Sequence, residues 1–339
     1  MKYIKLFDKD HVILDELHEY NSLIHGFALN ALGKCSFNVP LESIKCTQAN
    51  FQAFNCIEVW EDGKCLWWGV IAFAVPSRSV LNAMCYGYLY VLQKTVAWGG
   101  IVSVQLQALI ASDVSIFNIR SERLNTSRPN LTMGHSEDNT LMLNGVTLVD
   151  EDYYKRFQTI CMGYNFDFDV DADFKFNYYR RKGEDKPHYS VNYGTEADNV
   201  AGDPSFNVDT TGMANELVYE GSVMAKDTVS QGIYGKITAV SQVNLSDAGD
   251  IQNYINAELQ RTAYPSVSIQ ATIVDSALCP FNDIEIGDKV IANFPTYWGF
   301  SELMRIIEIN FDDMTGKCTL NLGNVIYRQQ PPQKKLYMR

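Results

Sequence analysis

Alternating hydrophobic and polar residues are clearest in the C-terminal part of the chain, between residues 283 and 323. The apolar residues there stand at every second position, or nearly so: Ile284, Ile286, Val290, Ile306, Ile309, Leu320 and Leu322. This is the period of strands with one buried face. Gly287-Asp288 and Thr315-Gly316 fall where such strands must reverse. The pattern predicts a β-meander, which no catalytic motif interrupts.

A second group of strands precedes residue 80. Residues 34–41 alternate, and residues 55–74 give the clearest hairpin, because Asp62-Gly63 at its tip suits the positive φ angles of a type I′ turn. Three tryptophans, Trp60, Trp67 and Trp68, flank this turn. They predict core packing or an interface between subunits, and a sugar-stacking platform is the alternative.

The pattern between these groups is less regular. Residues 80–98 carry apolar side chains at a helical period and end at Gly99-Gly100, which predicts a helix. Residues 101–119 indicate a further strand or buried segment. The polar stretch 121–144 predicts a long exposed loop, and residues 150–162 a short helix with an acidic start.

Strands return after residue 165, and an amphipathic helix is predicted over residues 247–261. Its apolar stripe is Ile251, Tyr254, Ile255 and Leu259. The regular alternation of helix and strand that builds a doubly wound sheet does not occur. We therefore expect a mainly β protein with α insertions, in which two β-barrel or sandwich units carry a partly helical insertion between them.

Composition and charge limit the classes of function that the protein can have. The 339 residues suffice for two or three domains, and 46% of them are hydrophobic. The net charge of −12 argues against binding DNA by neutralising its phosphates. The eight cysteines contain no C-x-x-C pair, which favours reduced, mostly buried thiols in a protein made in a cytoplasm. The chain shows neither a signal peptide nor an apolar run long enough for a membrane span.

Catalytic motifs are incomplete. His18-Glu19 begins like the zinc-protease motif H-E-x-x-H, but Ser22 stands where the second histidine belongs. The five histidines are scattered, and the phosphate-loop, dinucleotide and nucleophile-elbow motifs are missing from the sequence. Short basic groups such as Arg180-Arg181-Lys182 do not form a nucleic-acid site. We expect no catalytic residue, no metal and no cofactor, and hence a protein that is not an enzyme.

One acidic row stands out at period two: Asp167, Asp169, Asp171 and Asp173. On a single strand these carboxylates would share one face. A calcium loop needs a glycine-containing bend and a distal glutamate, and a glycosidase needs two carboxylates across a cleft. Neither feature is present. The row therefore predicts a solvated strand face or, more specifically, a face that lines an acidic channel.

The order of several short motifs resembles the hub proteins of bacteriophage tails, a family shared with contractile baseplates and type VI secretion spikes. In the C-terminal half these motifs are N-E-L-V-Y-E-G (215–221), Y-G-K-I (234–237), A-E-L-Q-R (257–261), P-S-V-S-I-Q-A-T-I-V-D (265–275), I-G-D-K-V (286–290), R-I-I-E-I (305–309) and T-L-N-L-G (319–323). In the N-terminal part, S-F-N-V-P-L (36–41) and I-E-V-W-E-D-G-K-C-L-W-W-G-V-I (57–71) look like the family's first strands.

The resemblance implies two tube-type β-barrels in each chain and a homotrimer, so that six barrels surround a channel. Such a hub would join the six-fold tail tube, or a distal tail protein, to a three-fold tip, spike or fibre protein. It would reside in the virion tail and meet DNA only in transit, past an acidic lumen that repels it. Two alternatives remain open: a tail-tip hydrolase, and a host-glycan-binding module that uses Trp60, Trp67, Trp68 and the loop at 121–144.

This interpretation divides the chain into five parts. The predicted parts are 1–80 for the first barrel strands, 81–165 for the partly helical insertion with its loop, 166–215 for strands and loops that complete or link the barrels, 216–328 for the second barrel, and 329–339 for a basic C-terminal arm.

Overall fold

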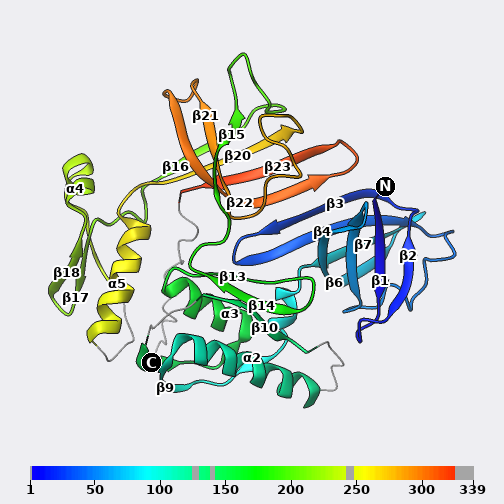
Figure 1. Ribbon diagram of the computed structural model, residues 1–339, viewed down its shortest axis with the longest axis horizontal. Helices are drawn as coiled ribbons and strands as arrows, with labels where there is room; N and C mark the ends of the chain where they lie inside the picture. Colours follow the sequence, from blue (N-terminus) through cyan, green and yellow to red (C-terminus); the bar gives the residue numbers. More distant parts are fainter. Residues whose placement is uncertain (1, 124–129, 138–141, 242–247, 325–339) are drawn as a thin grey trace, which may run out of the picture.

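The computed structural model describes residues 2–123, 130–137, 142–241 and 248–324. The basic arm predicted at 329–339 lies outside the described residues. The chain is mainly β with α insertions, as the sequence predicts. Hydrogen bonds join its principal strands into one sheet of 13 strands, whose main path runs β16-β20-β23-β22-β3-β4-β7-β6-β5-β1-β2. Figure 1 shows the two halves of this sheet, blue and orange, lying side by side.

The N-terminal half of the sheet, which we call the first β unit, is built from consecutive strands. These are β1 (Lys2–Phe7), β2 (Ile13–Leu17), β3 (Asn21–Ala28), β4 (Ala31–Pro40), β5 (Cys56–Glu61), β6 (Lys64–Pro76) and β7 (Val80–Tyr86). Alternate side chains of each strand enter one core, as Cys35, Phe37 and Val39 of β4 do. Because all seven strands give one face to the same core, the sheet must curve around it.

The second β unit has a separate core. Its strands are β15 (Asp185–Asn192), β16 (Ser205–Asp209), β20 (Ser266–Val274), β21 (Lys289–Phe294), β22 (Phe300–Asp312) and β23 (Lys317–Gly323). The predicted meander is confirmed: β21, β22 and β23 pair antiparallel in sequence order. Its predicted inward residues, including Ile306, Leu320 and Leu322, are fully buried in this core.

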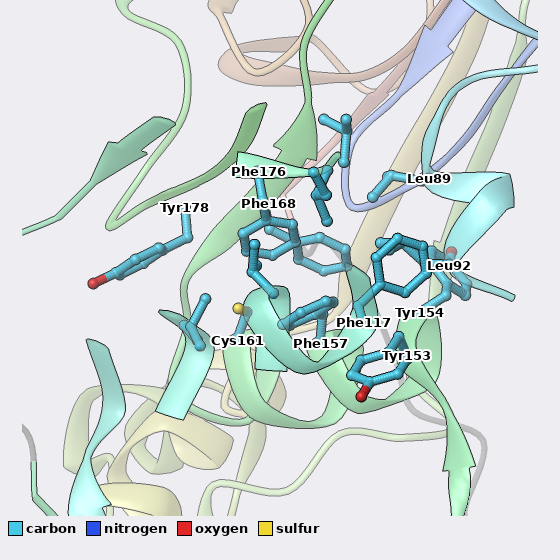
Figure 2. Packing of buried hydrophobic residues seen from close by; sticks show 14 of the residues in the cluster. Leu89, Leu92, Phe117, Tyr153, Tyr154, Phe157, Cys161, Phe168, Phe176 and Tyr178 are labelled. Atoms are coloured by element: carbon cyan, nitrogen blue, oxygen red, sulfur yellow. The ribbon is translucent and has the colours of Figure 1, made fainter. Parts of the chain in front are cut away.

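A middle unit follows the first β unit and packs around aromatic side chains. It contains α1 (Leu89–Leu92), β8 (Val96–Ala97), β9 (Gly100–Gln105), α2 (Leu106–Arg123), β10 (Thr132–Ser136), β11 (Met142–Leu148), β12 (Glu151–Asp152), α3 (Tyr153–Phe157), the π-helical turn η1 (Gln158–Met162), β13 (Asp167–Val170) and β14 (Lys175–Tyr179). Figure 2 shows the rings of Phe157, Phe168 and Phe176 meeting in its core, where Phe157 and Phe176 lie 4.2 Å apart between ring centroids.

A small unit separates the strands of the second β unit in sequence. It comprises β17 (Glu216–Tyr219), β18 (Ser222–Lys226), α4 (Thr228–Tyr234), β19 (Thr238–Val240) and α5 (Ala248–Thr262). Its three strands form their own sheet, and α5 covers it through Ile251 and Ile255. The second β unit therefore takes strands from residues 185–209, which lie in the part expected to complete or link the barrels, and from residues 266–323, which lie in the predicted second barrel at 216–328.

The prediction of a helix over residues 80–98 is wrong. Residues 80–86 form β7, which pairs with β4 on one side and β6 on the other, and only residues 89–92 are helical. Leu81, Ala83 and Cys85 alternate into the core of the first β unit. The apolar residues at helical spacing belong to a strand followed by a single helical turn, and pairing with β4 and β6 decides the outcome.

Two further expectations for the middle unit are met only in part. Residues 101–119 were expected to be a strand or buried segment: residues 100–105 form strand β9, and the rest belong to the 18-residue helix α2, which buries Leu106, Ile110 and Phe117. The described residues of the predicted loop at 121–144 include β10 and the start of β11. Within the described part of the chain, no helix combines the length and the apolar composition needed to cross a bilayer.

Candidate functional site: the junction between the two β units

The two β units meet where β3 pairs antiparallel with β22. The pairs run from Ala28 opposite Glu308 to Ile24 opposite Asp312. Gly26 makes this close approach possible: a Cβ placed on it would lie 2.0 Å from the carbonyl oxygen of Ile309. The continuous sheet therefore depends on a residue without a side chain at this position.

A buried ion pair ties the middle unit to the second β unit at the same junction. Asp167 of β13 and Arg305 of β22 form a salt bridge, and their side chains are 5% and 7% exposed. The carboxylate of Asp167 also accepts hydrogen bonds from the backbone N–H of Lys182, at 2.7 Å, and from the side-chain amide of Asn30, at 3.1 Å. Asn30 lies between β3 and β4, so Asp167 contacts both β units.

Further hydrogen bonds extend this network. Nε of Arg305 donates to the carbonyl of Gly287 at 3.0 Å, and Nη2 donates to the carbonyl of Lys182 at 2.6 Å. Oδ1 of Asn30 accepts from the backbone N–H of Phe168 at 2.7 Å. A buried charge pair is tolerated when each partner is fully hydrogen-bonded, and removal of one partner leaves the other charge uncompensated.

The I-G-D-K-V segment brings the backbone close enough for this network. Gly287 has a φ of 95°, which residues with a side chain rarely adopt. A Cβ on Gly287 would lie 2.5 Å from the carbonyl oxygen of Lys182. The adjacent Asp288 is 2% exposed and pairs with Lys186 at 2.8 Å. This motif therefore anchors the start of β21 against the segment between β14 and β15.

The structure divides the acidic row predicted to lie on one strand face. Strand β13 ends at Val170, so the expectation that four carboxylates share one strand face is wrong. Asp167 is buried, and Asp169 pairs with Lys182. Asp171 lies in the turn after β13, where its carboxylate accepts backbone hydrogen bonds from Asp173 and Lys175, each at 2.9 Å. The turn forms because an aspartate readily accepts bonds from the N–H groups that follow it.

Asp173 is the exposed member of the row, with 73% of its side chain accessible, and it pairs with Lys175 at the surface. The lining of a channel stays a prediction for this row. Asp167 forms a buried salt bridge with Arg305, and the partly exposed Asp169 pairs with Lys182.

A cavity of about 490 Å³ lies between the two β units and the middle unit. Its apolar walls include Phe27, Trp68, Phe168, Phe281 and Phe311, and Lys2, His25 and Lys182 also line it. The cavity therefore receives side chains from every part of the molecule that the Asp167 network connects.

His25 of β3 is the least satisfied polar side chain of the junction. It is 2% exposed, and neither ring nitrogen has a hydrogen-bond partner among the described residues. Burial, with a smaller contribution from the positive charge of Lys2, lowers the pKa of His25 to about 3. The imidazole is therefore neutral at physiological pH and packs as an aromatic ring against Phe311.

The three tryptophans of the β5–β6 hairpin have different environments. Trp67 is fully buried in the first core, and its Nε1–H donates to the carbonyl of Gly26 at 2.8 Å. Trp68 donates to the carbonyl of Val170 at 2.9 Å and so joins the first β unit to the middle unit. Trp60 is half-buried, with the Lys5 ammonium 4.0 Å from its ring centroid. A subunit-interface role stays a prediction for these tryptophans, of which Trp60 and Trp68 are partly exposed in the single chain.

The described residues contain no group of three or more His, Cys, Asp or Glu side chains placed to hold a metal ion. All eight cysteines are free. Burial raises the pKa of Cys65 and of Cys279 to about 12, so both thiols are protonated at neutral pH and are poor nucleophiles.

Sequence reasoning found Asp167 and Asp169 but missed Arg305, Asn30 and Lys182. A signal for Arg305 was available, since it is a lone cation within the apolar run M-R-I-I. Asn30 gave a weaker signal as a turn residue, and it does adopt a positive φ of 54°.

Solved structures similar to this chain are tail proteins of prophages and related assemblies. The prophage tail protein gp18 from Listeria monocytogenes aligns with a TM-score of 0.65 at 12% identity, over 96% of this chain and 95% of that one. The 43 kDa tail protein of prophage MuSo2 from Shewanella oneidensis gives 0.64 at 12% identity, over 95% and 97%. This chain has the fold of phage tail proteins.

The fold is also similar to that of secretion-system proteins, as the sequence resemblance implied. The E. coli c3393 protein, a component of the type VI secretion system described as similar to the T4 tail proteins gp27 and gp5, aligns with a TM-score of 0.51 at 12% identity, over 92% of this chain and 74% of that one. A chain of the PdpA–VgrG complex gives 0.52 at 9% identity, over 97% and 66%. No protein-family model and no curated protein sequence matches the chain.

Proposed function

We propose that the chain is a structural protein of a phage-type tail, a trimeric hub that joins the six-fold tail tube to the three-fold tail tip. The observation that carries this proposal is the presence of two β units in one chain, each with its own core, joined edge to edge through β3 and β22. Three such chains supply six β units, which is the number needed to meet a six-fold ring while keeping three-fold symmetry.

The comparisons support this proposal at the level of fold. The tail proteins align with nearly the whole chain, so the likeness includes both β units and the middle unit between them. The alignment with a chain of the PdpA–VgrG complex supports a neighbour of the tip or spike kind. The buried Asp167–Arg305 pair supports a fixed arrangement of the units, since a hub must hold its β units in register with the ring above.

The proposed hub surrounds a channel through which DNA passes. The net charge of −12 supports an acidic lumen, because like charges prevent the DNA backbone from adhering to the wall. The acidic row from Asp167 to Asp173 is the proposed lining, and Asp169, Asp171 and Asp173 are its members with side chains at least partly exposed. A trimer structure with these carboxylates on its outer surface would contradict this part of the proposal.

The oligomeric state tests the proposal. Light scattering on the purified full chain is expected to give three times the chain mass of 38.3 kDa. Mixing with the purified tube protein of the same tail should add one six-subunit ring to each trimer. A chain that stays monomeric at every concentration used, alone and with the tube protein, would overturn the hub.

A further inference from the structure

An exposed aromatic cluster lies at one end of the second β unit, where β21 turns into β22. Phe206 of β16 stacks on Tyr297 with 5.2 Å between ring centroids, and Trp298 meets the edge of Phe206 at 6.1 Å. Phe206 and Tyr297 thus support the base of the cluster. Trp298 projects from it with 89% of its surface exposed.

The backbone at Trp298 is unfavourable for a tryptophan. The N–H of Phe300 donates to the carbonyl of Tyr297 at 3.0 Å, and the two residues between them, Trp298 and Gly299, have φ angles of 54° and 71°. Positive φ at both central positions is the pattern of a type I′ turn, which favours asparagine or glycine at the first of them. A bulky side chain there is strained, and Trp298 recovers little of that cost by burial.

The surroundings of Trp298 are acidic. The loop before β16 packs against the turn, because Tyr193 donates to Asp203 at 2.8 Å and its ring lies 5.9 Å from that of Tyr297. Residues 187–209 contain Glu196, Asp198, Asp203 and Asp209 but no lysine or arginine, and residues 290–304 also lack both. The loop that packs beside the aromatic cluster therefore carries carboxylates and neither lysine nor arginine.

The other tryptophans of the chain already have partners. The Lys5 ammonium lies 4.0 Å from the ring centroid of Trp60, and the Arg120 guanidinium lies 4.0 Å from that of Trp98, whose side chain is otherwise 69% exposed. Trp67 and Trp68 donate hydrogen bonds to backbone carbonyls. Among the described residues, none places a cation over Trp298. Within the described part of the chain, cations thus lie over the indoles of Trp60 and Trp98, whereas the indole face of Trp298 is open.

We propose that Trp298 and its acidic rim form a docking surface for a neighbouring tail protein that places a lysine or arginine side chain on the indole face. The charge of the rim and the open face both favour a cation, which gains from the ring quadrupole and from nearby carboxylates at once. An exposed tryptophan of this kind is the residue type that contributes most to binding when a partner buries it. The inference rests on the proposed function only in taking the partner to be a tail protein.

Fluorine NMR of the full chain labelled with 5-fluorotryptophan tests whether the Trp298 indole binds a cationic side chain. The probe is the peptide Ac-Gly-Arg-Gly-NH2, and its matched control replaces arginine with the neutral isostere citrulline. The Trp298 resonance, identified by its loss in Trp298→Phe, is expected to move with the arginine peptide and not with citrulline. The resonances of Trp60 and Trp98 serve as internal controls and should stay in place. The Asp203→Asn variant should weaken the response several-fold.

Docking itself is measured with the purified tube and tip proteins of the same tail. Trp298→Asn is expected to weaken binding to one of them by about tenfold or more, the size of effect typical of a central interface tryptophan. The thermal midpoint of this variant should equal or exceed that of the wild type, because asparagine suits the turn. Loss of binding then reflects the missing indole rather than misfolding.

Several results would overturn the proposal. These are an equal response to the citrulline peptide, a Trp298 response to chitotetraose but not to arginine, or unchanged affinity of Trp298→Asn for both tail proteins. Dissociation of the chain's own oligomer by Trp298→Asn would also overturn it, since the cation would then come from a second copy. A monomeric wild-type chain that still responds to the arginine peptide would contradict the hub and leave this surface intact.

Discussion

At the scale of single residues, the junction is fixed by polar groups that are costly to bury. Asp167 and Arg305 offset each other's charge in a place where water does not reach them. His25 remains neutral at the same junction because burial disfavours its charged form. Replacement of Asp167 should therefore lower the free energy of unfolding more than replacement of an exposed aspartate. Replacement of His25 should change the pH dependence of that free energy more than replacement of an exposed histidine.

Replacement of Asp167 by asparagine tests the buried ion pair. Asp167→Asn keeps the shape of the side chain but leaves the Arg305 guanidinium buried without a counter-charge, so we expect the free energy of unfolding to fall by about 3–5 kcal/mol. Asp173→Asn is the matched control, because Asp173 is an exposed partner of Lys175, and it should cost less than about 1 kcal/mol. Urea unfolding measures both; equal costs for the two variants would contradict the assignment.

Because His25 is buried in its neutral form, we expect the free energy of unfolding to fall in acid. Its pKa is about 3 in the folded chain, below the ordinary value of about 6.5 in the unfolded chain. Between these values the unfolded chain binds one proton more, so stability decreases as the pH falls from about 6.5 towards 3, by up to about 1.4 kcal/mol per pH unit.

The free energy of unfolding, measured from pH 7 down to pH 4.5, checks this sign. His25→Leu removes the titrating group and should flatten the pH dependence by about one proton. His18→Gln, at a half-exposed histidine, is the control and should leave the wild-type slope. A His25→Leu slope equal to that of the wild type would show that another group causes the acid sensitivity.

At the scale of elements, the strand pair β3–β22 converts two β units into one sheet. Gly26→Ala would place a Cβ 2.0 Å from the Ile309 carbonyl oxygen, so the two strands must separate. We expect a loss of several kcal/mol, in the range of the large single-residue effects. We also expect the single unfolding transition to split into two, because the cores on either side become uncoupled.

Gly100→Ala provides the comparison for this variant, since a Cβ on Gly100 meets nothing within 4 Å. It should leave the urea midpoint close to that of the wild type. Protection of backbone amides from hydrogen exchange locates the effect: in Gly26→Ala it should fall first in β3 and β22. Unchanged protection in these two strands would refute the role of Gly26.

Some elements are predictable from the residue pattern and others are not, for physical reasons. The meander of β21–β23 was predictable because one face packs on a core and the other does not, so the alternation is visible in the residues themselves. Strand β7 was mistaken for a helix because apolar residues of the strand and of the helical turn after it happen to fall at helical spacing. The pairing of β7 with β4 and β6 decides its structure, and its partner residues in β4 lie at least 40 residues earlier in the chain. Helix α2 was missed because its apolar and polar residues do not separate into clear faces.

The candidate site was only half visible in the sequence. The period-two row drew attention to Asp167 and Asp169, but the end of β13 at Val170 turned Asp171 into a turn residue. The partners Arg305 and Asn30 lie 138 and 137 residues away from Asp167 along the chain. Their meeting follows from the β3–β22 pairing, which no local pattern reveals.

At the scale of the whole molecule, each chain holds two β units at one junction. Three chains would therefore present six β units, which can match a six-fold ring to a three-fold tip. The fold shared with phage tail proteins covers almost all of the chain, including the units that the sequence motifs did not match. The junction then fixes how the two β units face their neighbours. On this account, the Trp298 surface at the end of the second β unit is where one such neighbour binds.

Electron microscopy of the purified full chain shows whether three copies form the proposed hub. We expect three-fold symmetric particles in which six β lobes surround an open centre, with each chain contributing two adjacent lobes through its β3–β22 junction. Particles with one copy of the chain, or rings in which each chain contributes a single lobe, would contradict the proposed hub.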